Sequence, residues 1–499
     1  MWRSIRRQIR VRRDQLVEST AVTTGRNSSP GAGNGSARAG SKRDAPTRRR
    51  ATLPSVSPLH EVARAGRTGL AAAAGVGRFV VHTAADAVRL RPPSRAGIAH
   101  EVRTTFEHLG PTYVKLGQLI ASSPGVFTEE MSAEFESLLD RVPPADPKAI
   151  AELFVQEFGA RPDEVFASFD PEPIASASIA QVHTATLHDG QEVVVKIQRP
   201  GIADRLAPDV AILERAAGLV EISEYGRMLS ARHIVEDFAN GLDEELDFRN
   251  EAAAMREWYE CLQPSKYGSQ VRVPKVYDEF TTPKVLTMER IYALRIDDAE
   301  AVKAAGHDGV QLCRTLFLSL LESAFHGGLF HGDLHAGNVL VDADGKLVLL
   351  DFGIVGRFTP RTRRILRQLV VDLIVRKDYD SAGRAIFLLG AVHKPGSTSK
   401  GGADIKKVAM PLTSTELGEM SYTDLGRQMA AVAKAHDARL PRELVLVGKQ
   451  LLYVEKYIKL LAPRWKAMSD PEIFGYMASI MKEAERDRRA DKATDGAEG

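Results

Sequence analysis

Residues 331–338 read HGDLHAGN and residues 351–353 read DFG, and these two stretches decide the fold. Phosphoryl transfer needs a carboxylate that orients or deprotonates the attacking oxygen, and hard oxygen ligands that hold Mg²⁺ against the phosphates. Asp333 is predicted to fill the first role. Asn338, five residues further on, and Asp351 are predicted to be the metal ligands. The alternative, that these residues only cap polar loops and turns, does not explain their joint spacing.

A short hairpin is predicted between the two stretches. Residues 338–341 and 346–350 have strand character, and Asp344-Gly345 between them is a strong turn signal. Asn338 begins the first strand and Asp351 follows the second. The hairpin should therefore bring both predicted metal ligands to the same end.

A second hairpin is predicted upstream, with a turn at residues 188–190, and its second strand ends in the sequence VVKI at residues 194–197. Lys196 in that strand is expected to act in catalysis by binding nucleotide phosphates. The first strand carries ASASIAQV, which has the frame of GxGxxGxV with alanine in place of each glycine. Small residues let backbone amides approach phosphates, but alanine should make the loop stiffer than glycine would. Its predicted nucleotide-binding residues are Ala175, Ser176, Ala177, Ser178, Ala180 and Val182.

A phosphate-binding lysine needs a carboxylate partner, and the acidic helix EELDFRNE at residues 244–251 offers several. Glu251 is predicted to pair with Lys196, against the alternative of a solvated acidic helix face. Met288 and Glu289 end a short predicted strand and resemble a hinge that holds an adenine ring. The expected cofactors are therefore ATP or ADP, together with Mg²⁺.

The order of the predicted elements indicates an α+β, bilobal protein-kinase-like fold. It has a helical N-terminal extension and a mainly helical C-terminal lobe. The predicted divisions are a basic disordered tail (1–57), the extension (58–165), the N-lobe (166–290), the C-lobe (291–485) and a charged tail (486–499).

Composition excludes several other classes. The net charge of the 499-residue chain is only +2, which argues against a nucleic-acid partner. The basic charge gathers in the first 50 residues, whose 13 Lys and Arg against 3 Asp and Glu predict a solvated arm or one that meets an anionic surface. The two cysteines, Cys261 and Cys313, are too far apart in sequence to predict a zinc site, and they fit a reducing cytosol. No uninterrupted apolar stretch is long enough to span a membrane.

Residues 115–118 read KLGQ, and this KxGQ sequence completes a set of motifs. Together with the alanine-rich loop, Glu245-x-Asp247 and HGDLHAGN, it resembles the ABC1/UbiB (AarF, ADCK-type) family of atypical kinases. The resemblance implies that the KxGQ helix packs over the active site and meets the ExD element. It thus gives a regulatory role to Lys115, Gly117 and Gln118, with Glu245 and Asp247 as their partners.

The resemblance further implies an ATP-dependent phosphotransferase or ATPase that supports isoprenoid-quinone or other lipid metabolism. Such a protein would be cytoplasmic, with peripheral contact to a membrane, and its partners would be a nucleotide and an isoprenoid lipid or quinone precursor. The chain departs from the family pattern in reading ASAS where AAAS is usual. It also lacks the C-terminal spanning helices of the proteobacterial branch.

Three rival functions remain open at this point. Aminoglycoside- or choline-type small-molecule kinases share HGDxHxGN, but they lack KxGQ and the alanine-rich loop. A pseudokinase scaffold would bind nucleotide and signal through its shape, although every expected catalytic position is filled here. An ordinary Ser/Thr kinase fits least well, because no APE element follows Gly353.

Overall fold

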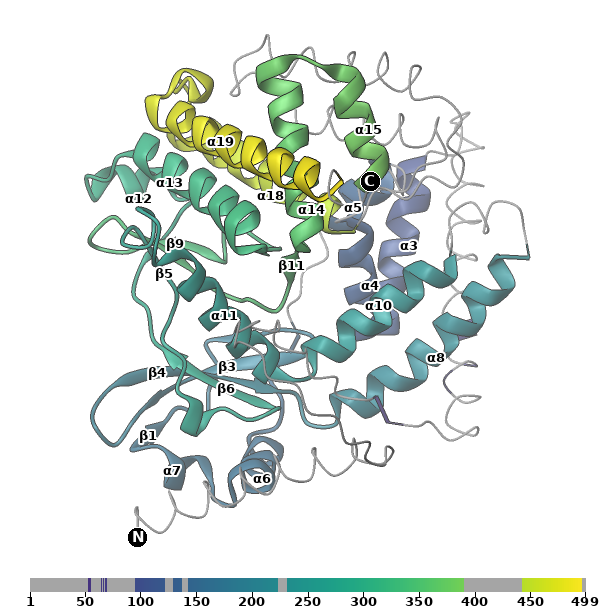
Figure 1. Cartoon of the computed structure of the whole chain (residues 1–499). Helices are drawn as coiled ribbons and strands as arrows, with labels where there is room; N and C mark the ends of the chain where they lie inside the picture. Colours follow the sequence, from purple (N-terminus) through teal and green to yellow (C-terminus); the bar gives the residue numbers. More distant parts are fainter. Residues whose placement is uncertain are drawn as a thin grey trace, which may run out of the picture.

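The computed structural model describes residues 53–54, 64, 66, 68–69, 95–121, 129–136, 142–222, 231–389 and 442–495. Within these residues the chain forms a strand-bearing small lobe, a helical large lobe, and a helical extension beside the small lobe (Figure 1). The α+β, bilobal kinase-like fold predicted from the motifs is confirmed. The predicted N-terminal tail, apart from residues 53–54, and the predicted loop at residues 394–402 lie outside the described residues.

In the described part of the extension lie the helices α3 (Arg95–Leu109), α4 (Pro111–Ala121) and α5 (Glu129–Glu136). The periodicity predicts one helix over residues 98–122, but the structure breaks it at Gly110, whose φ of 103° suits only glycine. The extension is fixed to the small lobe through Asp209, which is buried on α8 (Ile202–Val220). Asp209 accepts hydrogen bonds from Thr112 Oγ1 at 2.7 Å and from Arg64 Nε at 2.5 Å.

The small lobe is built on a five-stranded antiparallel sheet with the order β1-β3-β4-β6, in which β2 also pairs with β3. The predicted hairpin turn is present, since Gly190 joins β3 and β4 with a φ of 86°. The elements of this lobe are α6 (Pro147–Phe158), α7 (Pro162–Val165), β1 (Ser168–Phe169), β2 (Ala175–Ser176), β3 (Ala180–Thr186), β4 (Glu192–Gln198), α8, α10 (Ala231–Glu245), α11 (Phe248–Leu262), β5 (Val271–Arg272), η1 (Asp278–Phe280) and β6 (Val285–Glu289). Of these, β5 pairs in parallel with β10 and so belongs to a sheet of the large lobe.

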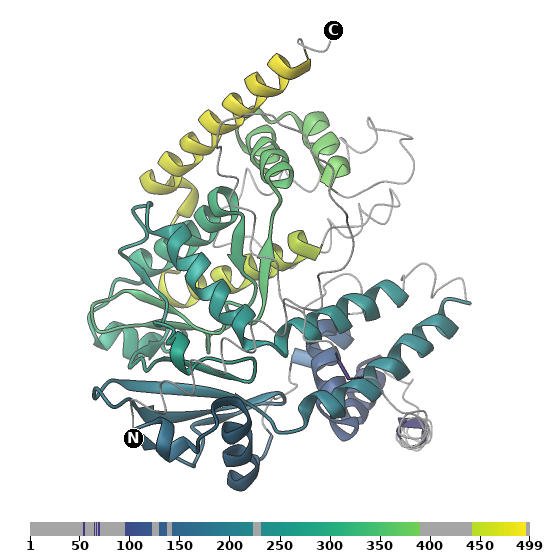
Figure 2. The same cartoon turned by 60° about the horizontal axis from the view of Figure 1, so that its bottom comes forward.

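Strand β4 decides which side chains face the interior of the small lobe. Successive side chains of a strand point to opposite faces. Val193, Val195 and Ile197 are fully buried against α6 and α7. Lys196 therefore projects from the other face, where it contacts Glu251 of α11. Figure 2 shows α6 on one side of this sheet and the large lobe on the other.

Helices α6 and α7 pack on this sheet and share its core. The sequence boundary at residue 165 assigned them to the extension, because their helical pattern continues that of the preceding residues. The structure places them in the small lobe, since the apolar face of α6, with Ile150 and Phe154, is buried against the strands.

The large lobe is mainly helical and carries two small sheets, one with the order β5-β10-β9-β7 and one with β11 beside β8. The predicted hairpin between Asn338 and Asp351 is present as the antiparallel pair β9 and β10, with Gly345 in its turn at a φ of 75°. The elements are β7 (Leu294–Arg295), α12 (Ala299–Ala304), α13 (Gly309–Glu322), η2 (Ser323–Gly327), β8 (Leu329–His331), β9 (Val339–Val341), β10 (Leu347–Leu349), β11 (Val355–Arg357), α14 (Pro360–Val370), η3 (Val371–Arg376), α15 (Tyr379–Leu389), α18 (Arg442–Leu461), η4 (Ala467–Ser469) and α19 (Pro471–Asp495).

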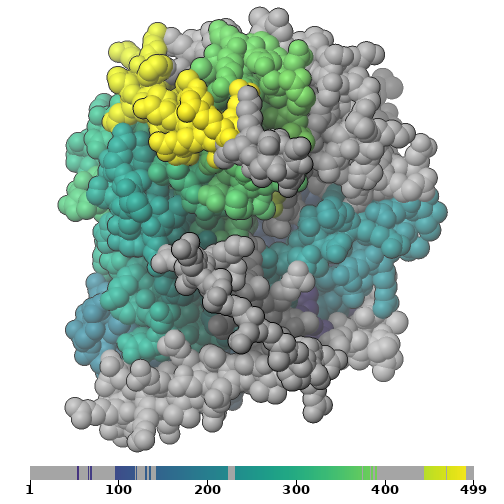
Figure 3. Space-filling view, in the orientation of Figure 1, coloured from purple at the N-terminus to yellow at the C-terminus, as the bar shows by residue number. Residues whose placement is uncertain are grey.

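The last helix, α19, corrects the prediction of a charged tail from residue 486. It continues to Asp495 and lies over the large lobe, where its segment is yellow in the space-filling view (Figure 3). Asp487, inside the predicted tail, accepts a hydrogen bond from Arg367 Nη2 on α14 at 2.6 Å. The earlier part of α19 is amphipathic, and its Ile473, Ile480 and Ala484 are buried.

Both cysteines are free, and Cys313 is buried. In the part of the chain that the structure describes, no helix combines the length and the hydropathy needed to cross a membrane.

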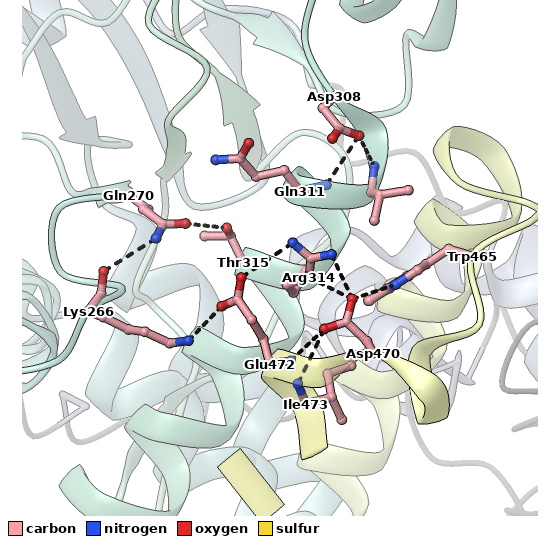
Figure 4. A network of polar contacts seen from close by, with 11 residues as sticks. Lys266, Gln270, Asp308, Gln311, Arg314, Thr315, Trp465, Asp470, Glu472 and Ile473 are labelled. Atoms are coloured by element: carbon pink, nitrogen blue, oxygen red, sulfur yellow. Dashed lines mark hydrogen bonds and ion pairs between the residues drawn. The ribbon is translucent and has the colours of Figure 1, made fainter. Parts of the chain in front are cut away.

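The N-terminus of α19 is held against α13 by a buried ion pair (Figure 4). Arg314 donates from Nη2 to Asp470 at 2.6 Å, and Asp470 also accepts from Trp465 Nε1 at 3.0 Å and caps α19 through the Glu472 backbone N–H. The Asp470 side chain is only 4% exposed. The neighbouring pair between Lys266 and Glu472 is 56% and 42% exposed.

Replacing Arg314 by Met should lower the free energy of unfolding by about 3 kcal/mol, because it leaves the Asp470 carboxylate buried without its charged partner. The matched control is Lys266→Met, which breaks an exposed ion pair and should cost less than about 1 kcal/mol. Urea unfolding of the two variants measures both values. Equal losses would contradict the account of how α19 is anchored.

A second contact joins η2 to α19 through a histidine. His326 lies 3.0 Å from Glu322 through Nδ1 and 2.6 Å from Glu483 of α19 through Nε2. The hydrogen bond to Glu322 and the charge of both carboxylates outweigh burial and raise the pKa of His326 above its ordinary value. Protonated His326 therefore stabilises the folded chain.

The pH dependence of stability follows from this sign. A raised folded-state pKa gives a stabilisation that is complete below about pH 6.5 and is lost as the pH rises through the folded value. The free energy of unfolding of the wild type, relative to His326→Gln, should therefore fall as the pH rises above about 6.5. Denaturant unfolding at several pH values tests this, and a difference that stays constant or grows with pH would refute it.

Candidate active site

A cavity of about 500 Å³ opens between the lobes, and the extension contributes to its wall. Charged side chains from three parts of the chain line it. Lys115 comes from α4, Lys196 from β4, and Asp333 and Asp351 from the loops that follow β8 and β10. These residues lie up to more than 200 positions apart in the sequence, and the fold brings them together in one cavity, as the predicted site requires.

The centre of the site is an ion pair between strand β4 and helix α11. Lys196 Nζ donates to both carboxylate oxygens of Glu251, at 3.0 and 2.9 Å, and lies 3.4 Å from Asp351 Oδ1. Glu251 stands in the first turn of α11 and its side chain is 5% exposed. The predicted pairing of these two residues is therefore present.

Lys196, Glu251 and Asp351 shift one another's pKa values. Burial would lower the pKa of the Lys196 ammonium, but Asp351 and Glu251 outweigh burial and hold that pKa above its ordinary value. Burial raises the pKa of Glu251 to about 7, against the attraction of Lys196. Desolvation opposes ionisation of Asp351, yet Lys196 and the Gly353 N–H lower the pKa of this carboxyl below its usual range. A charged lysine beside a charged carboxylate is the arrangement that can bind phosphate and a cation side by side.

The loop after β8 is held by internal hydrogen bonds. His331 is buried, accepts the Asp333 N–H at Nδ1 and donates from Nε2 to the Leu350 carbonyl at 2.9 Å. Asn338 Nδ2 donates to the Asp333 carbonyl at 3.0 Å. Burial lowers the pKa of His331, and the neutral ring stabilises the loop through these two hydrogen bonds.

Asp351 has a backbone conformation that non-glycine residues rarely adopt. Its φ is 53°, and its carboxylate accepts the Gly353 N–H at 3.1 Å. Phe352 packs between the rings of His331, at 4.7 Å, and Trp258 of α11, at 5.7 Å. Strain of this kind is typical of functional sites, and here the packed aromatic rings hold it in place.

The predicted metal ligands fit a hard cation. The hydrogen bond from Asn338 Nδ2 to Asp333 leaves the amide oxygen of Asn338 as the group that could face a metal. The Asp351 side chain is 49% exposed to the cleft. One carboxylate and one amide oxygen, with phosphate and water completing the shell, form the donor set that Mg²⁺ prefers. Mg²⁺ held by these residues would neutralise charge on the phosphates.

The alanine-rich loop is a tight turn between β2 and β3, closed by a hydrogen bond from the Ala177 N–H to the Ala180 carbonyl at 2.8 Å. Ala177 and Ala180 line the cavity. Arg199 at the end of β4 holds the loop, since its side chain donates to the Ala177 carbonyl at 2.6 Å and to Ser176 Oγ at 2.7 Å. The arginine also reaches the carbonyls of residues 142 and 143. Sequence reasoning missed this clamp, which adds to the stiffness expected from alanine.

The predicted adenine hinge is only partly available. Met288 is buried and paired with Val194 in the sheet. The Glu289 N–H donates to the Lys275 carbonyl at 2.9 Å, and its carboxylate binds Arg272 at 2.9 Å. A base at Glu289 would therefore have to use the remaining carbonyl group, because the N–H and the side chain are engaged within the protein.

The KxGQ helix meets the ExD element as the resemblance implied. Lys115 Nζ lies 2.8 Å from Glu245 Oε2, and both side chains are 20% exposed. Asp247 of the ExD element caps α11 through the Arg249 N–H at 3.1 Å and binds the Arg249 guanidinium at 2.6 Å. This is a local contact, because Asp247 immediately precedes α11. Gln118 and the buried Gly117 remain predicted regulatory residues.

Helix α18 supplies residues that sequence reasoning missed. Lys449 Nζ lies 2.9 Å from Asp333 Oδ1, and Gln450 and Tyr457 contact the backbone on either side of Asp333. No short motif marks them, since they lie more than 100 residues after the catalytic loop. The one signal was the amphipathic helical pattern of residues 442–461, which predicts burial but no chemistry.

Comparison with known proteins agrees with this geometry. The model of the ABC1 atypical kinase-like domain matches residues 137–385. An uncharacterized protein of Mycobacterium tuberculosis is 52% identical over 438 residues, which cover 86% of this chain and 90% of that protein. An uncharacterized chloroplastic aarF domain-containing protein kinase of Arabidopsis thaliana is 32% identical, with 74% and 73% of the two chains covered.

A probable protein kinase UbiB of Azotobacter vinelandii is 33% identical, with 73% of this chain and 68% of that protein covered. Among solved structures, the Rv3197–erythromycin complex from Mycobacterium tuberculosis matches with 25% identity and a TM-score of 0.46, covering 64% of this chain and 84% of that one. The family match, the relatives and the arrangement of the motifs agree, and the chain belongs to the ABC1/UbiB family of atypical kinase-like proteins.

Proposed function

We propose that this chain binds ATP with Mg²⁺ in the cleft between its lobes and uses it as an ATPase or as a kinase for a small lipid-like acceptor. One observation carries the proposal. Lys196 is held by Glu251 at 2.9 Å and stands 3.4 Å from Asp351, so that a phosphate-binding cation lies beside a candidate metal ligand. A structural ion pair alone would not need the third charge or the strained backbone at Asp351.

The remaining residues fit the chemistry of phosphoryl transfer. The oxygen of water or of an acceptor hydroxyl attacks the γ-phosphorus, the bond from that phosphorus to the ADP oxygen breaks, and the acceptor proton passes toward Asp333. Lys196 would hold the α- and β-phosphates. Asn338 and Asp351 would hold Mg²⁺, which neutralises charge on the phosphates.

The position of α4 supports a small acceptor over a folded protein. Lys115 lines the same cavity as Asp333, and its ion pair with Glu245 fixes α4 beside the opening. A protein substrate would need this space to bring a hydroxyl to Asp333. Together with the family resemblance, this favours an isoprenoid lipid or quinone precursor, met by a cytoplasmic protein at a membrane surface.

The experiment is ATP turnover by the purified chain with Mg²⁺, with and without anionic liposomes that carry a quinone-precursor mimic. Turnover should rise with the lipid, and Asp351→Asn and Lys196→Ala should each reduce it by at least about 100-fold, because both remove charge that acts on the phosphates. The matched control is Asp344→Asn, which makes the same chemical change in the exposed β9–β10 turn and should leave turnover unchanged.

Wild-type turnover in Asp351→Asn would overturn the assignment of the site. Nucleotide binding without turnover under every condition would instead favour a pseudokinase scaffold. Turnover that responds to a soluble amino alcohol and not to lipid would favour the small-molecule kinase alternative.

A further inference from the structure

Asp333 has a charged partner from a distant part of the chain. Lys449 on α18 places Nζ 2.9 Å from Asp333 Oδ1, and the two side chains are 15% and 23% exposed. Helix α18 lies beyond residues 137–385, which the family model covers. The cation next to the predicted catalytic carboxylate is thus supplied from outside the matched domain.

The helix that carries Lys449 is fixed to the catalytic loop at three further points. Gln450 donates from Nε2 to the Gly332 carbonyl at 2.7 Å and accepts the Leu334 N–H at 2.8 Å. Tyr457, two turns later on the same face, donates to the Leu334 carbonyl at 2.7 Å. Both side chains are fully buried. These bonds hold the backbone on both sides of Asp333, so the position of Lys449 relative to Asp333 is set by a rigid framework.

A surface ion pair of no consequence is the main alternative for Lys449. Exposed lysine–carboxylate pairs contribute about 0–1 kcal/mol and are held by flexible side chains. Lys449 differs because both partners are mostly buried, and because the buried contacts of Gln450 and Tyr457 fix its helix. Lys449 Nζ donates a hydrogen bond to Oδ1 of Asp333. Among the residues that the structure describes, the charged group recorded at Oδ2 is His335 Nε2 at 3.8 Å, beyond hydrogen-bond distance, which leaves Oδ2 for an acceptor oxygen.

Distance then places Lys449 near the reacting atoms. In phosphoryl transfer the acceptor oxygen contacts the carboxylate and approaches the γ-phosphorus to about 3–3.5 Å. The Lys449 ammonium already contacts Asp333 and therefore lies within reach of the oxygens of that phosphoryl group. The other lysines of the site pair elsewhere, Lys196 with Glu251 and Lys115 with Glu245.

We propose that Lys449 is a further catalytic residue of this site. It holds the Asp333 carboxylate toward the acceptor oxygen and contributes its charge to the γ-phosphoryl group during transfer. This inference rests on the proposed function, since it assumes that ATP occupies the cleft. Lys449 keeps its proton throughout, and the acceptor proton passes to Asp333.

The test compares Lys449→Met, Lys449→Arg and the control Lys456→Ala, an exposed lysine two turns along the same helix. Calorimetry measures the affinities for Mg²⁺–AMP-PNP and Mg²⁺–ADP, and steady-state kinetics gives kcat and KM for ATP. Lys449→Met should lower kcat by about 100-fold or more. It should weaken AMP-PNP binding by about 10-fold, the usual effect of a lost charged hydrogen bond, and leave ADP binding within about twofold.

Lys449→Arg should recover part of both losses, and Lys456→Ala should match the wild type. A purely structural role would weaken both nucleotides alike and lower the melting temperature without this selectivity. If Lys449→Met does not fold, Lys449→Gln, which keeps a donor without the charge, decides the same question.

The outcomes separate the two proposals. If the wild type turns over ATP and Lys449→Met has the same kcat and the same two affinities, the role of Lys449 is overturned and the proposed function stands. A wild type that binds nucleotide without turnover leaves the ratio of AMP-PNP to ADP affinity to decide for or against Lys449. A wild type that binds neither nucleotide overturns the proposed function and the role of Lys449 together.

Discussion

The ion pair between Lys196 and Glu251 is the contact on which the rest of the site depends. It joins β4 to α11 across the small lobe at 2.9 Å and is largely removed from solvent. Breaking such a pair leaves an uncompensated buried charge, which is strongly destabilising. Because Lys196 also lies 3.4 Å from Asp351, the pair connects the small lobe to the DFG segment, whose Phe352 in turn packs on α11.

Three lysines from three parts of the chain each meet a carboxylate around one cleft. Lys196 pairs with Glu251 in the small lobe, Lys115 of the extension with Glu245, and Lys449 of α18 with Asp333. Each of the three pairs places a cationic group beside a carboxylate at a position where phosphates would lie. It also makes the extension and the last helices part of the site and gives them a function beyond supporting a kinase-like core.

Local motifs predicted the site well where the chemistry is confined to short stretches. The Asp-Gly turns at residues 189–190 and 344–345 predicted the two hairpins, because strand alternation and turn geometry follow from neighbouring residues. The VVKI strand and the acidic helix at residues 244–251 predicted the pairing of Lys196 with Glu251. The sequence could not predict Arg199 as the clamp of the alanine-rich loop or Lys449 as the partner of Asp333. Those contacts depend on how whole elements pack, and a lysine on an amphipathic helix has no local mark of its partner. The continuation of α19 to Asp495 was missed for a related reason, since its charged sequence does not indicate the ion pair of Asp487 with Arg367 on α14.

The most direct measurement is an experimental structure of the chain with Mg²⁺ and AMP-PNP. The account predicts the α- and β-phosphates at Lys196, the metal between Asp351 and the Asn338 amide oxygen, and the γ-phosphate between Asp333 and Lys449. A nucleotide bound elsewhere, or phosphates that avoid Lys196 while its pair with Glu251 stays closed, would contradict the account.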